Sequence, residues 1–365
     1  MAATFIVKFP PDQLVERSLQ IILENQSPSG AFIASPNFPT YAFCWFRDSS
    51  YIAYALDLYG KHEAAARFHA WAASVINHRA DVVQRVLQKA AAGQPLTDDD
   101  VLHARYSLDG KENTSTFWEN FQLDGFGTWL WALLEHHKIA SASIPEEWLQ
   151  AAHLTADYLE GLWRFPCYDC WEEFGKEIHP HTLATIYGGL RAYSELTGDH
   201  REQTMQDILS FLQENAQPDG YWQKFIGNPQ VDASLLSLSI PYQLVQPENI
   251  VMRCTAEKIE TDLCRGGVKR YATDTYYGGG QWILLAAWLG WYWWAIGEQE
   301  KAWKLRRWIE NQADEHGWLP EQVAVEVNND AMIAPWMEKW GPSATPLLWS
   351  HAEYLILCNF MRDAG

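Results

Sequence analysis

Residues 281–312, QWILLAAWLGWYWWAIGEQEKAWKLRRWIENQ, decide the fold class of this chain. The first part, Trp282 to Ile296, is apolar on every side, as expected for a helix that is buried all round. After Gly297, the part from Glu300 to Gln312 carries charges on one face and large apolar residues elsewhere. A wholly buried helix followed by a half-exposed one predicts a helical hairpin that spans an inner and an outer layer.

A similar break between two helical segments, a glycine followed by polar residues, recurs at residues 58–63, 196–200 and 295–299. In each case a glycine ends one helix in a left-handed cap, and a polar pair opens an antiparallel neighbour. Almost no segment has a period of two, and helical patterns cover residues 13–25, 48–58, 62–75, 81–91, 125–137, 146–162, 182–196, 201–214, 250–264, 281–296, 300–312 and 346–361. We therefore predict an all-α fold, an (α/α)6 barrel of six hairpins in an inner and an outer ring, whose loops at one end build a pocket.

Length and composition favour one large domain. The chain has 365 residues, more than most single domains, but no Pro/Gly/Ser-rich linker or charge block divides it. The polar segment 93–114 is typical of a long surface loop rather than a hinge. We predict a single domain over residues 1–365.

Charge and hydropathy exclude several classes of partner. The net charge of −19 argues against nucleic acid, because binding a polyanion requires a basic surface. The apolar run Trp282 to Ile296 has 15 residues, short of the roughly 20 that a membrane span requires. Residues 1–8 lack the charged start and long apolar core of a signal peptide. We expect a cytoplasmic protein with a small neutral substrate, and no membrane partner.

Cysteine and histidine spacing predicts neither disulfides nor a metal site. Six cysteines are too few for disulfides to stabilise a chain of this length, and without an export signal we expect reduced thiols. Cys167 and Cys170 have the spacing of a zinc knuckle, but no second close pair accompanies them. The adjacent or nearly adjacent histidines do not share a helix face, so we expect them on the surface or in loops: His136, His137, His179 and His181.

Two separated glutamates have the setting of a catalytic pair. Glu172 lies between Trp171 and Glu173, and Glu321 follows Pro320. Cleaving a glycosidic bond takes two carboxyl groups, one that protonates the leaving oxygen and one that attacks or activates water. An indole and a second carboxylate nearby raise the pKa of a carboxyl group, so we expect Glu172 to be the acid. The 20 tryptophans fit a sugar ligand, because flat aromatic faces stack on pyranose rings.

Six segments follow one another in the order of a known family. They are Gly30–Pro36 with Tyr41–Asp48, Trp118 with Gln122–Gly125, Tyr168–Glu173, Arg270–Tyr277 with Trp282, Pro320–Gln322, and Leu348–Ala352. Together they resemble glycoside hydrolase family 15, the glucoamylase, glucodextranase and isomaltose glucohydrolase group. Six motifs spread from residue 30 to residue 352 are far more specific than any one of them.

The resemblance implies an inverting hydrolase with Glu172 as general acid and Glu321 as general base. Their carboxyl groups should then lie roughly 6.5–9.5 Å apart, with a water between them. Tyr41 takes the position of a tyrosine that contacts this water. Sugar binding is implied for Arg47, Asp48, Trp45, Trp118, Trp171, Glu173, Arg270, Tyr276, Trp282 and Trp349. This chemistry requires no metal or cofactor.

The resemblance also frames the substrate. Bacterial glucoamylases of this family usually carry an N-terminal β-sandwich domain, whereas here the first sugar-binding motif begins by residue 30, and no starch-binding module follows. We therefore expect a bare catalytic domain that releases β-D-glucose from the non-reducing end of isomaltose or short isomalto- and malto-oligosaccharides.

Two alternatives belong to other functional classes. One is hydrolysis or phosphorolysis of α,α-trehalose, although a phosphorylase on a similar barrel would lack the base carboxylate that Glu321 supplies. The other is a non-catalytic carbohydrate-sensing regulatory domain, which would show a degraded acid or base, whereas both residues are present.

Overall fold

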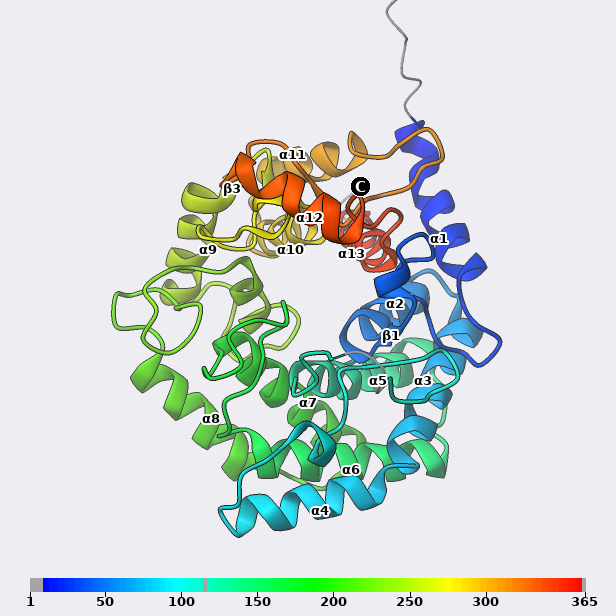
Figure 1. Cartoon of the computed structure of the whole chain (residues 1–365), viewed down its shortest axis with the longest axis vertical. Coiled ribbons are helices and arrows are strands. Elements are labelled where there is room, and N and C mark those ends of the chain that lie inside the picture. Colours follow the sequence, from blue (N-terminus) through cyan, green and yellow to red (C-terminus); the bar gives the residue numbers. More distant parts are fainter. Residues whose placement is uncertain (1–8, 114–116, 363–365) are drawn as a thin grey trace, which may run out of the picture.

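The helices of the chain close into a ring (Figure 1). The computed structural model describes residues 9–113 and 117–362. Six elements form the inner ring, each packed on the next, with the last closing on the first. In chain order they are α2 (Phe46–Leu58), α5 (Asp124–Ala140), α7 (Pro180–Thr197), η4 (Ala233–Leu238), α10 (Ile283–Ala295) and α13 (Leu348–Phe360).

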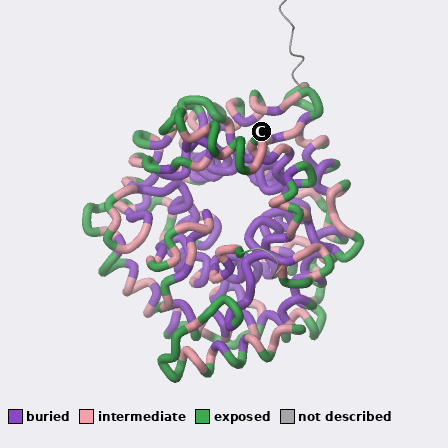
Figure 2. Tube along the Cα trace, in the orientation of Figure 1, coloured by how far each residue is buried: buried purple, intermediate pink, exposed green. Residues whose placement is uncertain are grey.

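Six outer helices alternate with the inner elements along the chain and cover them. They are α1 (Leu14–Glu24), α3 (His62–Asn77), α6 (Glu146–Leu162), α8 (Glu202–Asn215), α9 (Ile250–Leu263) and α11 (Gln299–Glu310). The predicted (α/α)6 barrel is confirmed. Every residue from Ile283 to Trp293 of α10 is buried, whereas α11 buries only Ala302, Leu305 and Ile309. Buried residues gather along the helices around the centre, and exposed residues lie on the periphery (Figure 2).

One predicted ring helix lies outside the ring, and a shorter element takes the vacant position. Helix α4 (Ala80–Ala91) packs on the outer face of α6. The remaining inner position, between α7 and α10, is filled by η4, a 3-10 helix of six residues. Its six residues are all buried, but the segment is too short to show a helical period.

Helices α5 and α7 approach closely because glycines face each other at their crossing. A Cβ on Gly127 would lie 2.3 Å from the carbonyl oxygen of Thr185, and a Cβ on Gly189 would lie 2.7 Å from Gly127. Contacts this short leave no room for even one methyl group. Asp124, the first residue of α5, accepts a hydrogen bond from the pocket residue Arg47, so this packing also supports one wall of the site.

We expect Gly127→Ala to lower the free energy of unfolding by about 1–3 kcal/mol, because the two backbones must separate to admit the methyl group. Urea unfolding followed by circular dichroism measures this loss. Gly290→Ala in α10 is the control, since its Cβ would meet the flexible end of Leu357, at 3.1 Å, and the side chain of Leu305 at an ordinary contact distance of 3.7 Å. Equal losses for the two variants would argue against the backbone contact as the cause.

Short strands tie the loops at one end of the ring. Strand β1 (Cys44–Trp45) pairs with β2 (Arg105–Tyr106), and β3 (Cys264–Arg265), β4 (Gly267–Val268), β5 (Gln281–Trp282) and β6 (Gln322–Val323) form a small antiparallel sheet. The expectation that residues 93–114 are a surface loop is wrong in part, because residues 100–106 are buried. Residue 114 lies outside the described residues. Among the described residues, no helix combines the length and apolar character needed to span a bilayer.

Candidate active site

A cavity of about 310 Å³ opens where the inner helices begin. Arg47 and Asp48 are in the first turn of α2, Trp349 is in the first turn of α13, and Trp282 directly precedes α10. All thirteen residues that the sequence singled out line this one cavity, namely Tyr41, Trp45, Arg47, Asp48, Trp118, Trp171, Glu172, Glu173, Arg270, Tyr276, Trp282, Glu321 and Trp349. Folding therefore brings together two glutamates that are 149 positions apart (321 − 172).

Glu321 is the most enclosed carboxyl group of the cavity, with 3% of its surface exposed. It directly precedes β6, whose pairing with β5 fixes the backbone. Its Oε1 accepts a hydrogen bond from the Tyr41 hydroxyl at 2.9 Å, and that hydroxyl lies 2.9 Å from the hydroxyl of Tyr276. In the described part of the chain, Oε2 has no hydrogen-bond partner. Burial raises the pKa of Glu321 to about 7, although the Tyr41 hydrogen bond and the charge of Arg270 act to lower it.

Glu172 lies half-buried on the loop before α7, with a backbone φ of 67°. This left-handed conformation is uncommon for a residue other than glycine, and it is found most often where function requires it. Its Oε1 accepts hydrogen bonds from the indole N–H groups of Trp45 (2.7 Å) and Trp118 (3.0 Å) and from the amide of Gln122 (3.2 Å). Among the described residues, none donates to Oε2.

The surroundings expected for Glu172 need correction. Its indole contacts come from Trp45 and Trp118, because the Trp171 N–H donates instead to Asp232, at 3.0 and 3.1 Å. The strongest burial falls on Glu321, not on Glu172. Adjacent residues in a tight turn point in different directions, so sequence neighbours do not define the environment of a side chain.

A buried ion cluster holds the loop that carries Glu172. Asp169 accepts hydrogen bonds from the backbone N–H groups of Trp171 (3.0 Å) and Glu173 (2.9 Å). Lys224 bridges Asp169 (3.1 Å) and Asp232 (2.6 Å), and no more than 5% of any of these three side chains is exposed. Although burial acts to raise the pKa of Asp169, the charge of Lys224 contributes to a net lowering. This cluster fixes both the backbone of the loop and the orientation of Trp171.

Arg47 and Asp48 form an ion pair at the base of the cavity, with the Arg47 Nε 3.2 Å from Oδ1. The Arg47 Nη1 also donates to Gln122 (3.1 Å) and Asp124 (3.3 Å). Burial raises the pKa of Asp48 to about 6, although Arg47 opposes this rise. The guanidinium lies 5.1 Å from the ring of Trp349. A charged pair with fixed geometry offers both donors and acceptors to the hydroxyl groups of a ligand.

Trp349 is itself held from behind by a buried carboxyl group. Its indole N–H donates to Glu353 at 2.8 Å, and only 1% of the surface of Glu353 is exposed. Burial raises the pKa of Glu353 to about 8. Glu353 does not line the cavity, so it supports the aromatic wall without reaching a ligand.

Arg270 is the second arginine that lines the cavity. It forms two hydrogen bonds with Asp274, of 2.8 Å and 2.5 Å, and one with Glu173 of 3.3 Å. Glu173 also accepts a hydrogen bond from the Tyr271 hydroxyl at 2.5 Å. The guanidinium lies within 5.5 Å of four aromatic rings, those of Trp171, Tyr271, Tyr276 and Trp282. Arg270 and Glu173 are thus a preorganised pair of polar groups in an aromatic wall.

A pair of carboxyl groups with different surroundings, in a cavity of aromatic and charged residues, is the arrangement of a glycosidase. The model of the glycosyl hydrolases family 15 matches residues 12–334. The chain belongs to this family. It is therefore a glycoside hydrolase.

Similar proteins cover almost the whole of this family 15 chain. It is 37% identical over 356 residues to the isomaltose glucohydrolase of Kribbella flavida. The alignment covers 95% of this chain and 92% of that protein. A glycosidase variant solved in complex with glucose superposes with a TM-score of 0.92 at 37% identity, covering 96% of this chain and 97% of the other. A bacterial glucoamylase complexed with acarbose shares the fold, with a TM-score of 0.72 at 19% identity, covering 95% of this chain and 55% of the other.

The rim of the family 15 pocket contains residues that the sequence did not single out. Glu119 lies beside Trp118, and the short helix α12 (Ile333–Trp340) places Trp336, Lys339 and Trp340 along the cavity. The ring of Trp336 packs on that of Tyr276, with centroids 4.9 Å apart. The tryptophans of this segment could have indicated a sugar-binding role. The segment is not recognisable as a helix, however, because it has only eight residues and one of them is a proline.

The histidine expectations are wrong for His136 and His181 of this family 15 chain, which are each 2% exposed and lie within α5 and α7. His137 lies at the surface and His179, although 2% exposed, lies in the loop before α7, as expected. His181 bonds to the Ser237 hydroxyl at 2.7 Å, and His179 to the carbonyl oxygen of Cys167 at 3.0 Å. These two histidines form hydrogen bonds with buried backbone and hydroxyl groups inside the ring of helices. The six cysteines are all free.

Proposed function

We propose that this glycoside hydrolase is an inverting, exo-acting α-glucosidase that releases β-D-glucose from the non-reducing end of isomaltose or short isomalto- and malto-oligosaccharides. The observation that carries this proposal is the placement of Glu172 and Glu321 in one cavity, with one carboxyl oriented by N–H donors and the other buried beside a tyrosine hydroxyl.

Glu172 acts as the general acid. In a protonated carboxyl group the carbonyl oxygen accepts hydrogen bonds and the other oxygen carries the proton. Three N–H groups bind Oε1, so Oε2 is the oxygen that presents the proton to the glycosidic oxygen. Trp45, Trp118 and Gln122 thereby set the direction of proton transfer, and the leaving sugar departs as an alcohol.

Glu321 acts as the general base. Its Oε2, which has no hydrogen-bond partner among the residues that the structure describes, accepts the proton of the water that attacks the anomeric carbon. A pKa near 7 leaves a substantial ionised fraction at neutral pH and makes the carboxylate a stronger proton acceptor than an ordinary glutamate. The Tyr41 hydroxyl steadies the ionised form and lies beside the position of that water.

The remaining predicted residues hold the sugar rings. Arg47 and Asp48 bind hydroxyl groups of the non-reducing glucose at the base of the cavity, and Trp349 supports that ring. Arg270 and Glu173 bind from the aromatic wall, between Trp171 and Trp282. The leaving sugar lies at the rim, near Trp118 and α12. A cavity of about 310 Å³ is at the small end of ligand sites, which favours a short substrate over a polysaccharide.

Product analysis with a substrate panel tests this proposal. Glucose release from isomaltose, maltose, trehalose and dextran is measured, and proton NMR during the first turnovers identifies the anomer. We expect isomaltose to be the best of the four and the β-anomer to appear first, because water attacks from the face opposite the leaving group. Initial release of the α-anomer would refute inversion, and a preference for trehalose would favour the alternative of α,α-trehalose hydrolysis.

The pH dependence of kcat/KM reports on Glu321. Because the base must be ionised, kcat/KM should fall as the pH drops through about 7, the pKa of this carboxyl group. Tyr41→Phe removes a hydrogen bond that lowers this pKa, so the acidic limb should move to higher pH in the residual activity. Tyr277→Phe is the control, since its hydroxyl donates to the Gly341 carbonyl oxygen. An acidic limb that is the same in all three proteins would contradict the role of the Tyr41 bond.

A further inference from the structure

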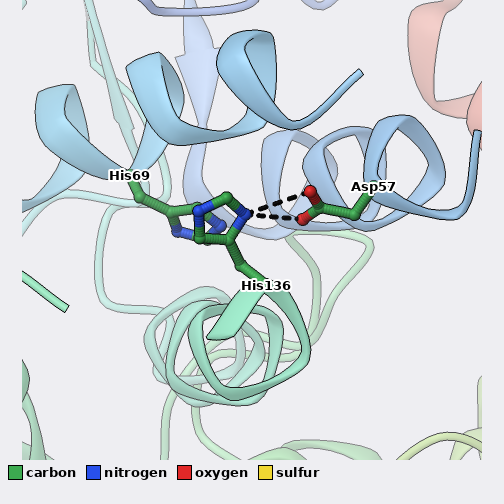
Figure 3. Close-up of side chains that lie close together, drawn as sticks. All are labelled: Asp57, His69 and His136. Carbon is green, nitrogen blue, oxygen red and sulfur yellow. Dashed lines mark hydrogen bonds and ion pairs between the residues drawn. The ribbon is translucent and has the colours of Figure 1, made fainter. Parts of the chain in front are cut away.

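Asp57, His69 and His136 lie close together inside the protein (Figure 3), and none of them lines the catalytic cavity. They come from α2, α3 and α5, and their relative exposures are 1%, 0% and 2%. One nitrogen or oxygen atom from each residue lies within 4.8 Å of the others. Asp57 is near the end of α2 and Arg47 is near its start, so the cluster is roughly 15 Å along the helix from the base of the cavity.

His69 is the unusual member, because both of its ring nitrogens are buried and neither has a hydrogen-bond partner within residues 9–113 and 117–362. A neutral imidazole carries one donor and one acceptor, and leaving such groups unpaired in the interior is costly. The ring of His69 lies against that of His136, with centroids 5.0 Å apart, and Trp148 packs beside both rings. The rings of His136 and Trp148 thus hold the His69 imidazole in place, and neither of its nitrogens is used in a hydrogen bond among the described residues.

Asp57 completes a ligand set. Its carboxylate lies 2.9 and 3.0 Å from the Nδ1 of His136 and 2.8 Å from the Nδ1 of His62. Among the described residues, no lysine or arginine forms an ion pair with Asp57, and its side-chain partners are the imidazoles of His62 and His136. The side chain of His62 is 40% exposed, which places one edge of the cluster near solvent.

We propose that Asp57, His69 and His136 bind a zinc ion. Two imidazoles and one carboxylate suit a divalent cation of intermediate softness, with water as the fourth ligand. The ion takes the place of the proton between His136 and Asp57, which is released or moves to the other ring nitrogen of His136. His62 stays in the outer shell and holds the second carboxylate oxygen, as hydrogen-bonded neighbours of metal ligands commonly do.

The site would connect α3 to α5 and to α2, whose other end carries the pocket residues Arg47 and Asp48. We therefore expect zinc to act on stability, with no part in the hydrolytic reaction. The sequence gives no hint of this site, because the three ligands are 12 and 67 positions apart (69 − 57 and 136 − 69). Only the packing of α2, α3 and α5 brings them together.

Metal binding by the full chain, with any affinity tag removed, tests the proposal. After chelation and dialysis, zinc is added back, and metal content is measured by mass spectrometry alongside Tm. We expect about one zinc per chain and a higher Tm, because an ion that binds only the folded state stabilises it. In His69→Phe, zinc uptake and the Tm shift should both disappear, while the apolar ring fills the same buried space.

The matched control is His153→Gln, which removes a partly exposed histidine near Asp157 and Asp199. This variant should keep the wild-type stoichiometry. Cobalt added to the wild-type protein should give the strong visible absorption of a four-coordinate site, a measurement that does not depend on any variant folding. The proposal is overturned if cobalt gives no such band, or if wild type binds no more zinc than His69→Phe. The three residues would then be a metal-free hydrogen-bonded cluster.

Discussion

Replacing Glu321 with glutamine is expected to lower kcat by roughly 10²–10⁴-fold, the range that general acid–base groups contribute. The amide has nearly the shape of the carboxylate but does not take a proton from water. The free energy of unfolding should not fall, because a neutral group suits a side chain that is 3% exposed. Initial rates with isomaltose and urea unfolding measure the two effects separately.

Glu353→Gln is the matched control, a second buried glutamate outside the cavity. Since burial raises the pKa of Glu353 to about 8, the side chain is mostly neutral at pH 7, and glutamine reproduces that state. Its carbonyl oxygen still accepts the hydrogen bond from Trp349, so we expect little change in kcat. Wild-type kcat in Glu321→Gln would refute the base assignment, whatever the control shows.

Replacing Lys224 with methionine is expected to lower the free energy of unfolding by about 3–5 kcal/mol, the usual effect of removing one partner from a buried ion cluster. Asp169 and Asp232 would then face each other without a cation, in a region where at most 5% of either side chain is exposed. Because Asp169 holds the loop of Glu172, kcat/KM should fall as well. Urea unfolding and hydrolysis of isomaltose measure the two losses.

Lys258→Met provides the comparison at a partly exposed pair. Lys258 lies 2.9 Å from Asp262 on one helix face, and about a third of each side chain is exposed. Such pairs contribute only about 0.3–0.5 kcal/mol. If Lys224→Met cost no more than this, the buried bridge would not be what holds the loop.

The ring was predictable because most of its helices have strong patterns and clear ends. Gly60, Gly198 and Gly297 all adopt positive φ, as predicted for glycines that end helices in left-handed caps. The exchange of α4 for η4 was not predictable in the same way. The period of an amphipathic helix shows that one face is covered, but not which element covers it, and six residues are too few to show a period. The extent of the catalytic domain and the cytoplasmic location stay predictions.

The pocket residues were predictable where a motif carries them, and their supports were not. Glu172, Glu321 and the arginines lie in segments with a distinctive order of residues. Lys224 stands in an ordinary stretch of sequence, and nothing local distinguishes it from a surface lysine. Its role arises because folding places it between two aspartates, 55 and 8 positions away. The catalytic roles themselves stay predictions until the variants are measured.

The start of the inner helices at the cavity has an electrostatic consequence. The N-terminal end of a helix carries a partial positive charge, because its first N–H groups point outward without partners in the helix. Helices α2, α10 and α13 all begin beside the pocket, which contains five acidic side chains, those of Asp48, Glu119, Glu172, Glu173 and Glu321. The converging backbone dipoles offset part of the repulsion among these groups. An acidic sugar pocket in a chain of net charge −19 is thereby stabilised by the main chain itself.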